Sequence, residues 1–406
     1  MPDNIPASRK FIYSFLIVAI FFGGLELALR AYDFQFYFNF SADLLGMPLL
    51  DLCKFRRVAN QTVNFDPQVF WKFKPNQILD AKGIYKKPVR INNFGFRGKD
   101  FQLEKKPGTY RIICLGDSVT FGWSVADEET YPAQLEKILQ EKYPDRDIEV
   151  LNLGVTGYTS FQGKKLFLTF AEKLKPDLVI FGFGQNDRLP ALKSDQELFE
   201  TKAWRKNKLD LFLSHSQVYK ILKAGVIYLQ RRQEGLSLDP TTYLPRLKRK
   251  VSQEEYQDNF KRIKEECDQL GCKLILLNVD FPSLAIDPAN SALKSLEQKH
   301  NAHLLKNWQE WDSLKLIQKI STESGAKLLD LRSVFASYLV ELEEGKGDQK
   351  RKSEFDQALG EDVKNEPWKY LMIDNGHPNE WGHQIIAESL ANLIEAEAFF
   401  NQHKEK

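Results

Sequence analysis

Hydrophobic and polar residues follow three different patterns along the chain. Residues 11–29 are almost unbroken apolar sequence, with Glu26 as the single charge. Residues 41–108 contain short β-prone pieces, such as 89–91, between prolines. From Tyr110 onward, short apolar runs alternate with segments whose apolar residues recur at helical spacing. The last pattern is typical of strands and helices that follow each other in alternation.

The alternating part predicts an α/β fold. Five apolar runs are predicted to be strands, at 111–115, 149–153, 178–183, 273–279 and 327–331. Helices are expected near 131–142, 161–174, 254–270, 310–324 and 380–397. Strands that are apolar on both faces belong to parallel sheets with helices on both sides. We therefore predict a three-layer α/β/α fold around a parallel sheet of about five strands, with ligands at the carboxyl ends of the strands.

The same patterns divide the chain into regions. We expect an N-terminal membrane anchor over 1–30, a juxtamembrane lead-in over 31–108 that packs against the following domain, and one α/β domain over 109–398. Two insertions interrupt the α/β pattern. Residues 190–252 are expected to be mostly helical and are basic, and residues 341–366 are so rich in Glu, Lys, Asp and Gly that we expect a solvated loop or a mobile flap.

The apolar stretch at residues 11–29 is predicted to be a single transmembrane helix. Nineteen residues at about 1.5 Å each span roughly 28 Å, close to the hydrocarbon thickness of a bilayer. Arg9 and Lys10 precede the stretch and only Arg30 follows within the next twenty residues, which favours a cytoplasmic amino terminus. The domain would then be extracytoplasmic, on the periplasmic or cell-surface side.

Two alternatives to the anchor remain open. A cleaved signal peptide needs a small-residue cleavage site, and residues 28–31 match one poorly. A buried core helix is the other, although residues 11–25 have no polar face.

Composition excludes several classes of protein. With 43% hydrophobic and 28% charged residues, the 406-residue chain is neither disordered nor polytopic. Its 57 basic and 55 acidic residues leave a net charge of +2, so no global field favours nucleic acid as a partner. Four cysteines cannot form the framework of a small secreted domain, although Cys267 and Cys272 could pair in an oxidising compartment. The sequence has no metal-binding motif of the CxxC or HExxH type, and no metal site is predicted.

Two short blocks follow the first two predicted strands. In the first, Ser118 comes after Gly116 and Asp117 at the start of a helix, where a helix dipole favours developing negative charge. A helix N-cap would look the same. In the second, Gly154 and Gly157 would let backbone N–H groups point into the cleft, as would a bare turn.

Two further blocks complete the set. Asn186 follows the third strand, where its amide could donate to an oxyanion or could merely cap a loop. Asp374 and His377 lie three residues apart just before the last helix. A carboxylate on Nδ1 would leave Nε2 of the imidazole free to act as a base.

Together and in this order, the four blocks resemble those of the SGNH, or GDSL-type, hydrolase family. The matching residues are Gly116, Asp117 and Ser118, with Val119 where leucine is usual, then Gly157, then 184–187, and finally Asp374 and His377. The resemblance covers about 110–190 and 370–397. The G-x-S-x-G turn of the α/β-hydrolases is absent, which fits the SGNH family and counts against the other.

The resemblance implies a flavodoxin-like fold and acyl transfer through a covalent serine ester. Ser118 would be the nucleophile, His377 the base and Asp374 the group that orients the imidazole. The backbone N–H groups of Ser118 and Gly157 and the side chain of Asn186 would form the oxyanion hole. No metal or organic cofactor is implied. Asp117, Asp187 and His383 are expected to be structural.

We therefore expect a membrane-anchored serine esterase or acylhydrolase. Its substrate would be a carboxylic ester, either an O-acetyl group on a surface polysaccharide or the acyl ester of a lipid. An acyltransferase that acetylates a cell-envelope glycan is the main alternative. A catalytically silent envelope binding protein is a third, and the intact set of Ser118, Asn186, Asp374 and His377 counts against it. The expected partners are this small-molecule, glycan or lipid ester and the membrane, with no nucleic acid.

Overall fold

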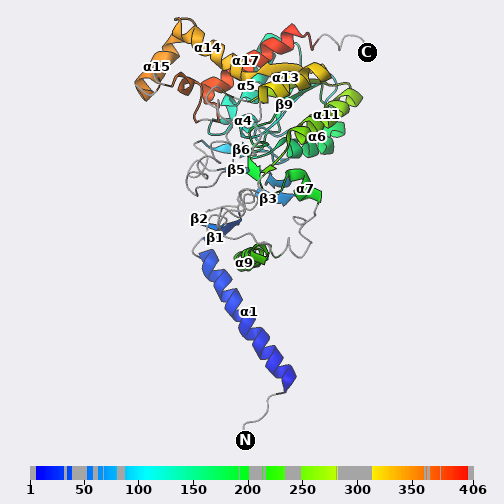
Figure 1. The fold of residues 1–406 in the computed structure, drawn as a ribbon, viewed down its shortest axis with the longest axis vertical. Helices are drawn as coiled ribbons and strands as arrows, with labels where there is room; N and C mark the ends of the chain where they lie inside the picture. The colour runs from blue at the N-terminus through cyan, green and yellow to red at the C-terminus, as the bar shows by residue number, and fades with distance from the viewer. Residues whose placement is uncertain are drawn as a thin grey trace.

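A computed structural model provides the fold. It describes residues 6–31, 34–38, 53–57, 63–66, 68–79, 87–191, 193–200, 213, 216–233, 248–279, 281, 313–360, 363, 366–374 and 376–400. A long N-terminal helix extends away from a body in which helices surround one sheet (Figure 1).

The central sheet has the predicted strands. They are β7 (Tyr110–Gly116), β8 (Ile148–Asn152), β9 (Leu178–Gly182), β12 (Lys273–Asn278) and β13 (Lys327–Asp330). All neighbours are parallel, in the order β13-β12-β9-β7-β8. Counted along the chain this order is 2-1-3-4-5, the flavodoxin-like arrangement. The predicted fold class is confirmed, and each strand boundary lies within one residue of its expected position.

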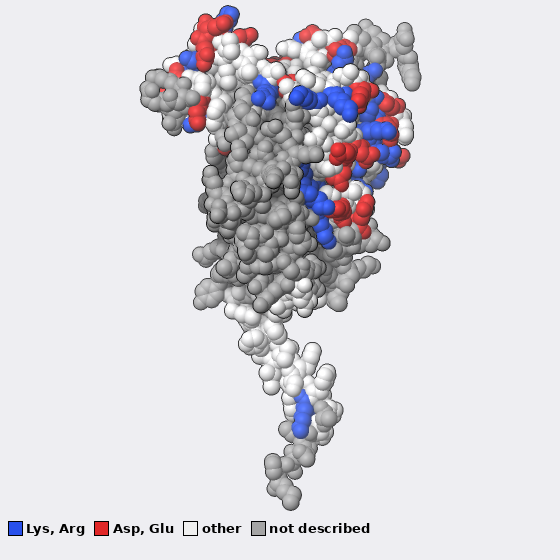
Figure 2. Space-filling model, in the orientation of Figure 1, with Lys and Arg blue, Asp and Glu red and all other residues white. Residues whose placement is uncertain are grey.

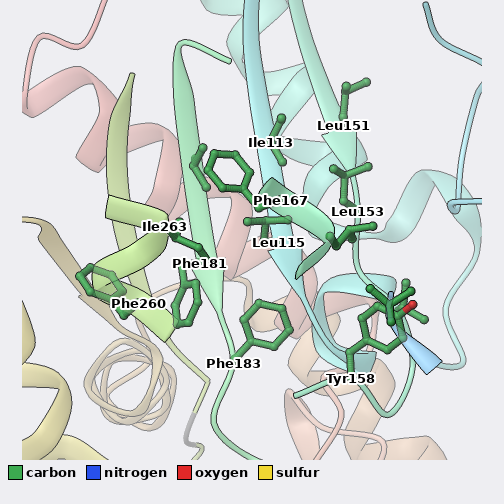
Figure 3. Close-up of a cluster of buried hydrophobic side chains, with 14 of the residues drawn as sticks. Ile113, Leu115, Leu151, Leu153, Tyr158, Phe167, Phe181, Phe183, Phe260 and Ile263 are labelled. Carbon is green, nitrogen blue, oxygen red and sulfur yellow. The ribbon is translucent and has the colours of Figure 1, made fainter. Parts of the chain in front are cut away.

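Side chains of each strand alternate between two hydrophobic layers. Ile113 of β7 faces the layer covered by α6 (Ser160–Leu174), α11 (Gln253–Leu270) and α13 (Ser313–Ser324). Ile112 faces the opposite layer, covered by α5 (Tyr131–Lys142), α14 (Leu331–Glu343) and α17 (Glu380–Ala396). Figure 3 shows the first layer, where Phe181 of β9 meets Phe260 of α11 at a ring-centroid distance of 5.4 Å. The sheet is therefore buried on both faces, as its apolar strands require.

Local sequence signals explain where the helices begin and end. Ser252 caps α11 in a capping box with Glu255, and Gly271 ends the helix in the left-handed region at φ 71°. Thr130 caps α5, which has a proline in its first turn.

The lead-in forms small hairpins that join the core of the domain. β3 (Val63–Asp66) pairs with β4 (Phe70–Phe73), and β5 (Gln77–Leu79) pairs with β6 (Val89–Ile91). Their buried side chains, which include Phe73 and Val89, belong to the same hydrophobic cluster as Ile113. A further hairpin, β1 (Phe34–Phe38) with β2 (Cys53–Arg57), lies near the carboxyl end of the N-terminal helix (Figure 1).

The first insertion was expected to be mostly helical, and its described part contains two helices. The described part of 190–252 contains α7 (Asp195–Glu200), α9 (Gln217–Gln233) and the short pair β10 (Pro190–Ala191) and β11 (Lys248–Arg249).

The expectation of a loop at 341–366 was wrong for α15 (Gln349–Leu359). This helix is capped by Asp348, whose side chain accepts from Arg351 N, and its Phe355 ring packs 5.5 Å from that of Trp381. Phe355 also packs against the ring of Tyr370. These two aromatic contacts stabilise the helix despite the polar composition of the segment.

The N-terminal helix α1 (Ala7–Ala31) is long and apolar enough to cross a membrane. Its window Ser8–Ala31 has a mean hydropathy of 2.1, and none of that window is buried against the rest of the chain. Figure 2 shows its visible surface free of charge except near the amino end, where the sequence has Arg9 and Lys10. The lack of burial excludes a core helix and leaves two alternatives, a membrane anchor and a signal peptide.

Cys267 and Cys272, the pair considered for a disulfide, are free buried thiols in this structure. The N–H of Cys272 donates to the carbonyl of Cys267 at 2.9 Å, where α11 ends. The hydrogen bond with the neighbouring Cys272 thiol, together with burial, raises the pKa of Cys267, which keeps it protonated. Cys114 is also free and fills the second layer of the core, as expected from its place in the first strand.

Candidate active site

The predicted site residues converge at the carboxyl edge of the sheet. Ser118 follows β7, Gly157 lies in the loop after β8, and Asn186 lies in the loop after β9. These three strands are adjacent, and the chain reverses its direction of progress across the sheet at β7. Open α/β sheets form a crevice at such a switch point.

Close backbone packing positions Ser118 at the end of β7. A Cβ on Gly116 would lie 1.9 Å from Thr120 Oγ1, so only glycine fits there. Asp117 caps the following helix α4 (Ser118–Phe121) by accepting from Val119 N at 2.9 Å. Ser118 itself is only partly buried, although the residues on both sides are fully buried. The turn therefore presents its hydroxyl to the cleft.

The length of α4 changes one expectation from the sequence. The helix is a single turn and ends at Gly122, which has φ 83°. So short a helix has little macrodipole, because aligned peptide dipoles must add along the axis. The helix dipole expected beside Ser118 is therefore weak.

His377 links Ser118 to Asp374. Its Nε2 lies 2.9 Å from Ser118 Oγ, and its Nδ1 lies 2.8 and 2.9 Å from the two carboxylate oxygens of Asp374. Asp374 Oδ1 also accepts from the backbone N–H groups of Gly376 and His377, at 2.8 and 2.9 Å. The aspartate thus holds both the imidazole and the turn that carries it.

The electrostatics of the pair orient the imidazole, with Nδ1 toward the carboxylate of Asp374. Partial burial tends to raise the pKa of Asp374, but the hydrogen bonds and charge of His377 and the two backbone donors lower it by more. An ionised Asp374 accepts a hydrogen bond from Nδ1–H, which leaves Nε2 directed at the Ser118 hydroxyl.

The loop after β8 has two glycines with different roles. A Cβ on Gly154 would lie 2.4 Å from the backbone nitrogen of Phe121, so this glycine allows two backbones to approach closely. Gly157 has φ 80° and is partly exposed, and the ring of Trp71 lies 3.6 Å from the place that a Cβ would take. Gly157 is thus the one whose backbone conformation requires glycine on the cleft side.

Asn186 is tied to the same loop. Its Nδ2 donates to the carbonyl of Tyr158 at 3.0 Å and lies 3.4 Å from Asp117 Oδ2. Burial raises the pKa of Asp117 to about 6. The contacts hold the amide between the serine turn and the residue that follows Gly157. Gln185, one position earlier, donates to Val279 O at 2.9 Å and to Gly376 O at 3.4 Å, and so connects this loop to the histidine turn.

Asp187 and His383 lie in the structural positions expected for them. Asp187 is fully buried and accepts from Ser160 N at 3.0 Å and from the Ser160 hydroxyl. Burial raises its pKa to about 7. His383 is buried in α17, where its Nδ1 accepts from Tyr131 N at 3.2 Å. Burial, with the charges of Arg97 and His377, lowers its pKa to about 3, so it stays neutral.

Three residues near the site were not anticipated from the sequence. The ring of Trp123 lies 5.7 Å from that of His377, and the ring of Trp71 lies 5.4 Å from that of Tyr158. Arg97 is buried and donates to Phe121 O at 3.0 Å, to Gly122 O and to Val125 O at 2.6 Å. It therefore fixes the loop that carries Trp123.

Only one of these three residues has a signal in the sequence. Trp123 lies five positions after Ser118 and could have been singled out by this short separation. Trp71 and Arg97 belong to the lead-in, whose short hairpins have no periodic pattern that would place them beside the sheet.

Comparison with known proteins identifies the family. The model of the GDSL-like lipase/acylhydrolase family matches residues 114–385. An arylesterase from Vibrio mimicus is 30% identical over 79 residues, which are 20% of this chain and 38% of that protein. The chain thus matches well under half the length of this curated relative.

Two solved structures illustrate the structural likeness. The α/β hydrolase enzyme LAE5, from the metagenome of Lake Arreo, is 18% identical, with 74% of this chain and all of that chain covered at a TM-score of 0.38. An acetylxylan esterase from Geobacillus stearothermophilus is 18% identical, with 71% and 96% covered at a TM-score of 0.37. The family match runs from the end of β7 through the other four strands of the sheet and includes the serine turn and the histidine turn, and the chain belongs to the GDSL-like lipase/acylhydrolase family.

Proposed function

We propose that the protein is a serine esterase that cleaves a carboxylic ester through an acyl-serine intermediate. The observation that carries the proposal is the continuous chain of hydrogen bonds from Ser118 Oγ through His377 to Asp374. A serine hydroxyl within 2.9 Å of an imidazole nitrogen, whose other nitrogen is held by a carboxylate, is the arrangement that activates serine as a nucleophile.

The reaction follows from these contacts. As Ser118 Oγ attacks the ester carbonyl, His377 Nε2 takes the hydroxyl proton, and the ionised Asp374 stabilises the imidazolium that forms. Collapse of the tetrahedral intermediate breaks the bond to the alcohol oxygen, which receives the proton from Nε2. Water, with a proton removed by the same nitrogen, then attacks the acyl-serine and releases the acid.

Negative charge on the former carbonyl oxygen needs donors that are already in place. We assign this role to the backbone N–H groups of Ser118 and Gly157 and to the amide of Asn186. The left-handed conformation of Gly157 and the bond from Asn186 to Tyr158 O support the assignment, because both keep the donors at the mouth of the serine turn. Preorganised donors of this kind each contribute about 3 kcal/mol to transition-state stabilisation.

We also propose that α1 is an uncleaved anchor and that the domain lies outside the cytoplasm. The apolar segment of the helix and the basic residues Arg9 and Lys10 before that segment support this topology. An enzyme held there would reach two kinds of ester, O-acetyl groups on a surface polysaccharide and acyl esters of lipids.

The test is hydrolysis of short- and medium-chain nitrophenyl esters by the full chain in detergent. Ser118→Ala is expected to lower kcat/KM by roughly three orders of magnitude or more, because it removes the nucleophile. Ser353→Ala, an exposed serine on α15, is the matched control and should leave the rate unchanged.

Two results would contradict the proposal. Equal rates for Ser118→Ala and the wild type would exclude Ser118 as the nucleophile. Absence of free acid, with the acyl group recovered on an added sugar acceptor, would favour the acyltransferase instead.

A further inference from the structure

Helix α9 has an exposed row of apolar side chains. Leu222, Val226 and Leu229 are 53%, 52% and 57% exposed. Their spacing of four and three positions places them on one face of the helix. A single exposed apolar residue is common on any protein, but a row along a helix needs an environment that is not water.

The amino end of α9 is bonded to α1. The carboxylate of Glu26 accepts from Ser216 Oγ at 2.8 Å, from Gln217 N at 3.1 Å and from Val218 N at 3.0 Å. Arg30, one turn further along α1, donates to the same carboxylate at 2.7 Å. A negative group at a helix N-terminus satisfies free N–H groups and stabilises the helix. Glu26 therefore connects α9 directly to α1.

The position of Glu26 sets the level of α9 relative to a membrane. It is the first charge after the fifteen residues at 11–25, which contain no Asp, Glu, Lys or Arg. A carboxylate at the end of such a segment lies near the edge of the hydrocarbon, where charges in membrane helices occur with partners. Since Glu26 bonds the first residues of α9, that helix begins at the same level.

The direction of α9 also fits a membrane surface. In Figure 1, α9 is seen nearly along its own axis beside the upper end of α1, whose axis runs close to the plane of the picture. The two helices therefore cross steeply. With α1 across a bilayer, α9 would lie along the surface.

The charge of α9 indicates which lipids it would meet. Its sequence has basic residues at positions 220, 223, 231 and 232 and no acidic residue. Helices that lie in the membrane interface combine an apolar face with Lys and Arg, and they bind anionic lipid headgroups.

We propose that α9 is an interfacial helix that lies in the headgroup region of an anionic bilayer, with Leu222, Val226 and Leu229 in contact with acyl chains. The proposal rests on the anchor role of α1 in the proposed function. It gives the domain a second attachment, so that the body is held at a fixed height above the lipid instead of swinging on a single helix.

The experiment measures the depth of three labelled positions in the full chain. The protein is reconstituted into vesicles of phosphatidylcholine and phosphatidylglycerol, with an environment-sensitive fluorophore on Val226→Cys, Ile17→Cys or Val340→Cys. Val340, on α14 at the far end of the body, is the matched control, because it is a valine with an exposed fraction of 54%. Ile17 of α1, 68% exposed, reports on the anchor. The unsubstituted protein corrects for labelling of native cysteines.

Spin-labelled phosphatidylcholine with the label near the headgroup end of the acyl chain serves as the quencher. We expect Val226→Cys to lose most of its fluorescence and Val340→Cys to lose none. Quenching of Ile17→Cys by a deep label, together with an unquenched Val226→Cys, would overturn the role of α9 and leave the anchor intact.

Further outcomes separate this proposal from the esterase. If neither the shallow nor the deep label quenches any of the three positions, α1 is not a membrane anchor and the proposal for α9 fails with it. Hydrolysis of nitrophenyl esters by the same vesicles tests the proposed chemistry independently, since the labels are not on residues of the site described above.

Discussion

Asp374 has two tasks that depend on its charge and geometry. One of its oxygens accepts from two backbone N–H groups of its own turn, and both oxygens lie within 2.9 Å of His377 Nδ1. The side chain is also 50% exposed, so water can reach the carboxylate. A substitution of Asp374 can therefore change the tautomer of the His377 imidazole while the hydrogen bonds that hold the turn are kept.

We predict that Asp374→Asn lowers kcat/KM by roughly 10²–10⁴, because the asparagine amide can present a donor to Nδ1 and favour the wrong tautomer. The backbone bonds of the turn can persist through Oδ1, so stability should change little. Asp268→Asn, an exposed aspartate paired with Lys264 on α11, is the matched control. Unchanged ester hydrolysis by Asp374→Asn would remove Asp374 from the proposed triad.

Asp187 is predicted to make stability depend on pH. Its pKa rises from the ordinary 3.8 to about 7 in the folded protein because of burial. Folding therefore binds a proton between these two values, and the contribution of Asp187 is fully present below about pH 4 and is lost as the pH rises through about 7. Asp187→Asn should show a smaller loss of stability over this window than the wild type, measured by thermal unfolding. Parallel curves for the two proteins would contradict the assignment.

At the scale of single elements, two helix glycines give opposite predictions. A Cβ on Gly163 of α6 would lie 2.3 Å from the ring of Phe183, whereas a Cβ on Gly225 of α9 would meet nothing within 4 Å. Alanine favours a helix by about 1 kcal/mol over glycine, but overpacking a core costs about 1–3 kcal/mol.

Gly163→Ala should therefore lower the melting temperature, and Gly225→Ala should leave it unchanged or raise it. Phe183 leads into the loop of Asn186, so Gly163→Ala should also reduce ester hydrolysis. A melting temperature of Gly163→Ala at or above that of the wild type would show that the Phe183 ring moves aside.

The elements that were predicted correctly are those whose signal is local. The five strands are continuous apolar runs, and parallel strands bring their carboxyl ends together, so the chain order alone placed Ser118, Gly157 and Asn186 at one edge. Helix α15 was missed because its stability comes from Phe355 against Trp381, a contact made across the fold. The Arg97 contacts were missed for the same reason, since the lead-in that supplies this side chain has no helical or strand periodicity.

At the scale of the whole molecule, the proposed topology of α1 decides which compartment holds the enzyme. A phosphatase that is active only outside the cytoplasm, fused after residue 400, is expected to be active. A fluorescent protein that folds only in the cytoplasm, fused at the same position, should be dark. Retention of both fusions in the membrane fraction would distinguish an anchor from a cleaved signal peptide. A bright fluorescent fusion with an inactive phosphatase would reverse the topology.

The distance along the chain between Ser118 and His377 has a consequence for synthesis. The two residues whose side chains meet at 2.9 Å are 259 positions apart, and the sheet strands β8, β9, β12 and β13 are made between them. A growing chain therefore has a serine turn with no base while most of the domain is still being translated. In the proposed topology, the base reaches the serine only after residue 377 has been translocated. Acyl chemistry would thus begin only in the compartment where its product is released.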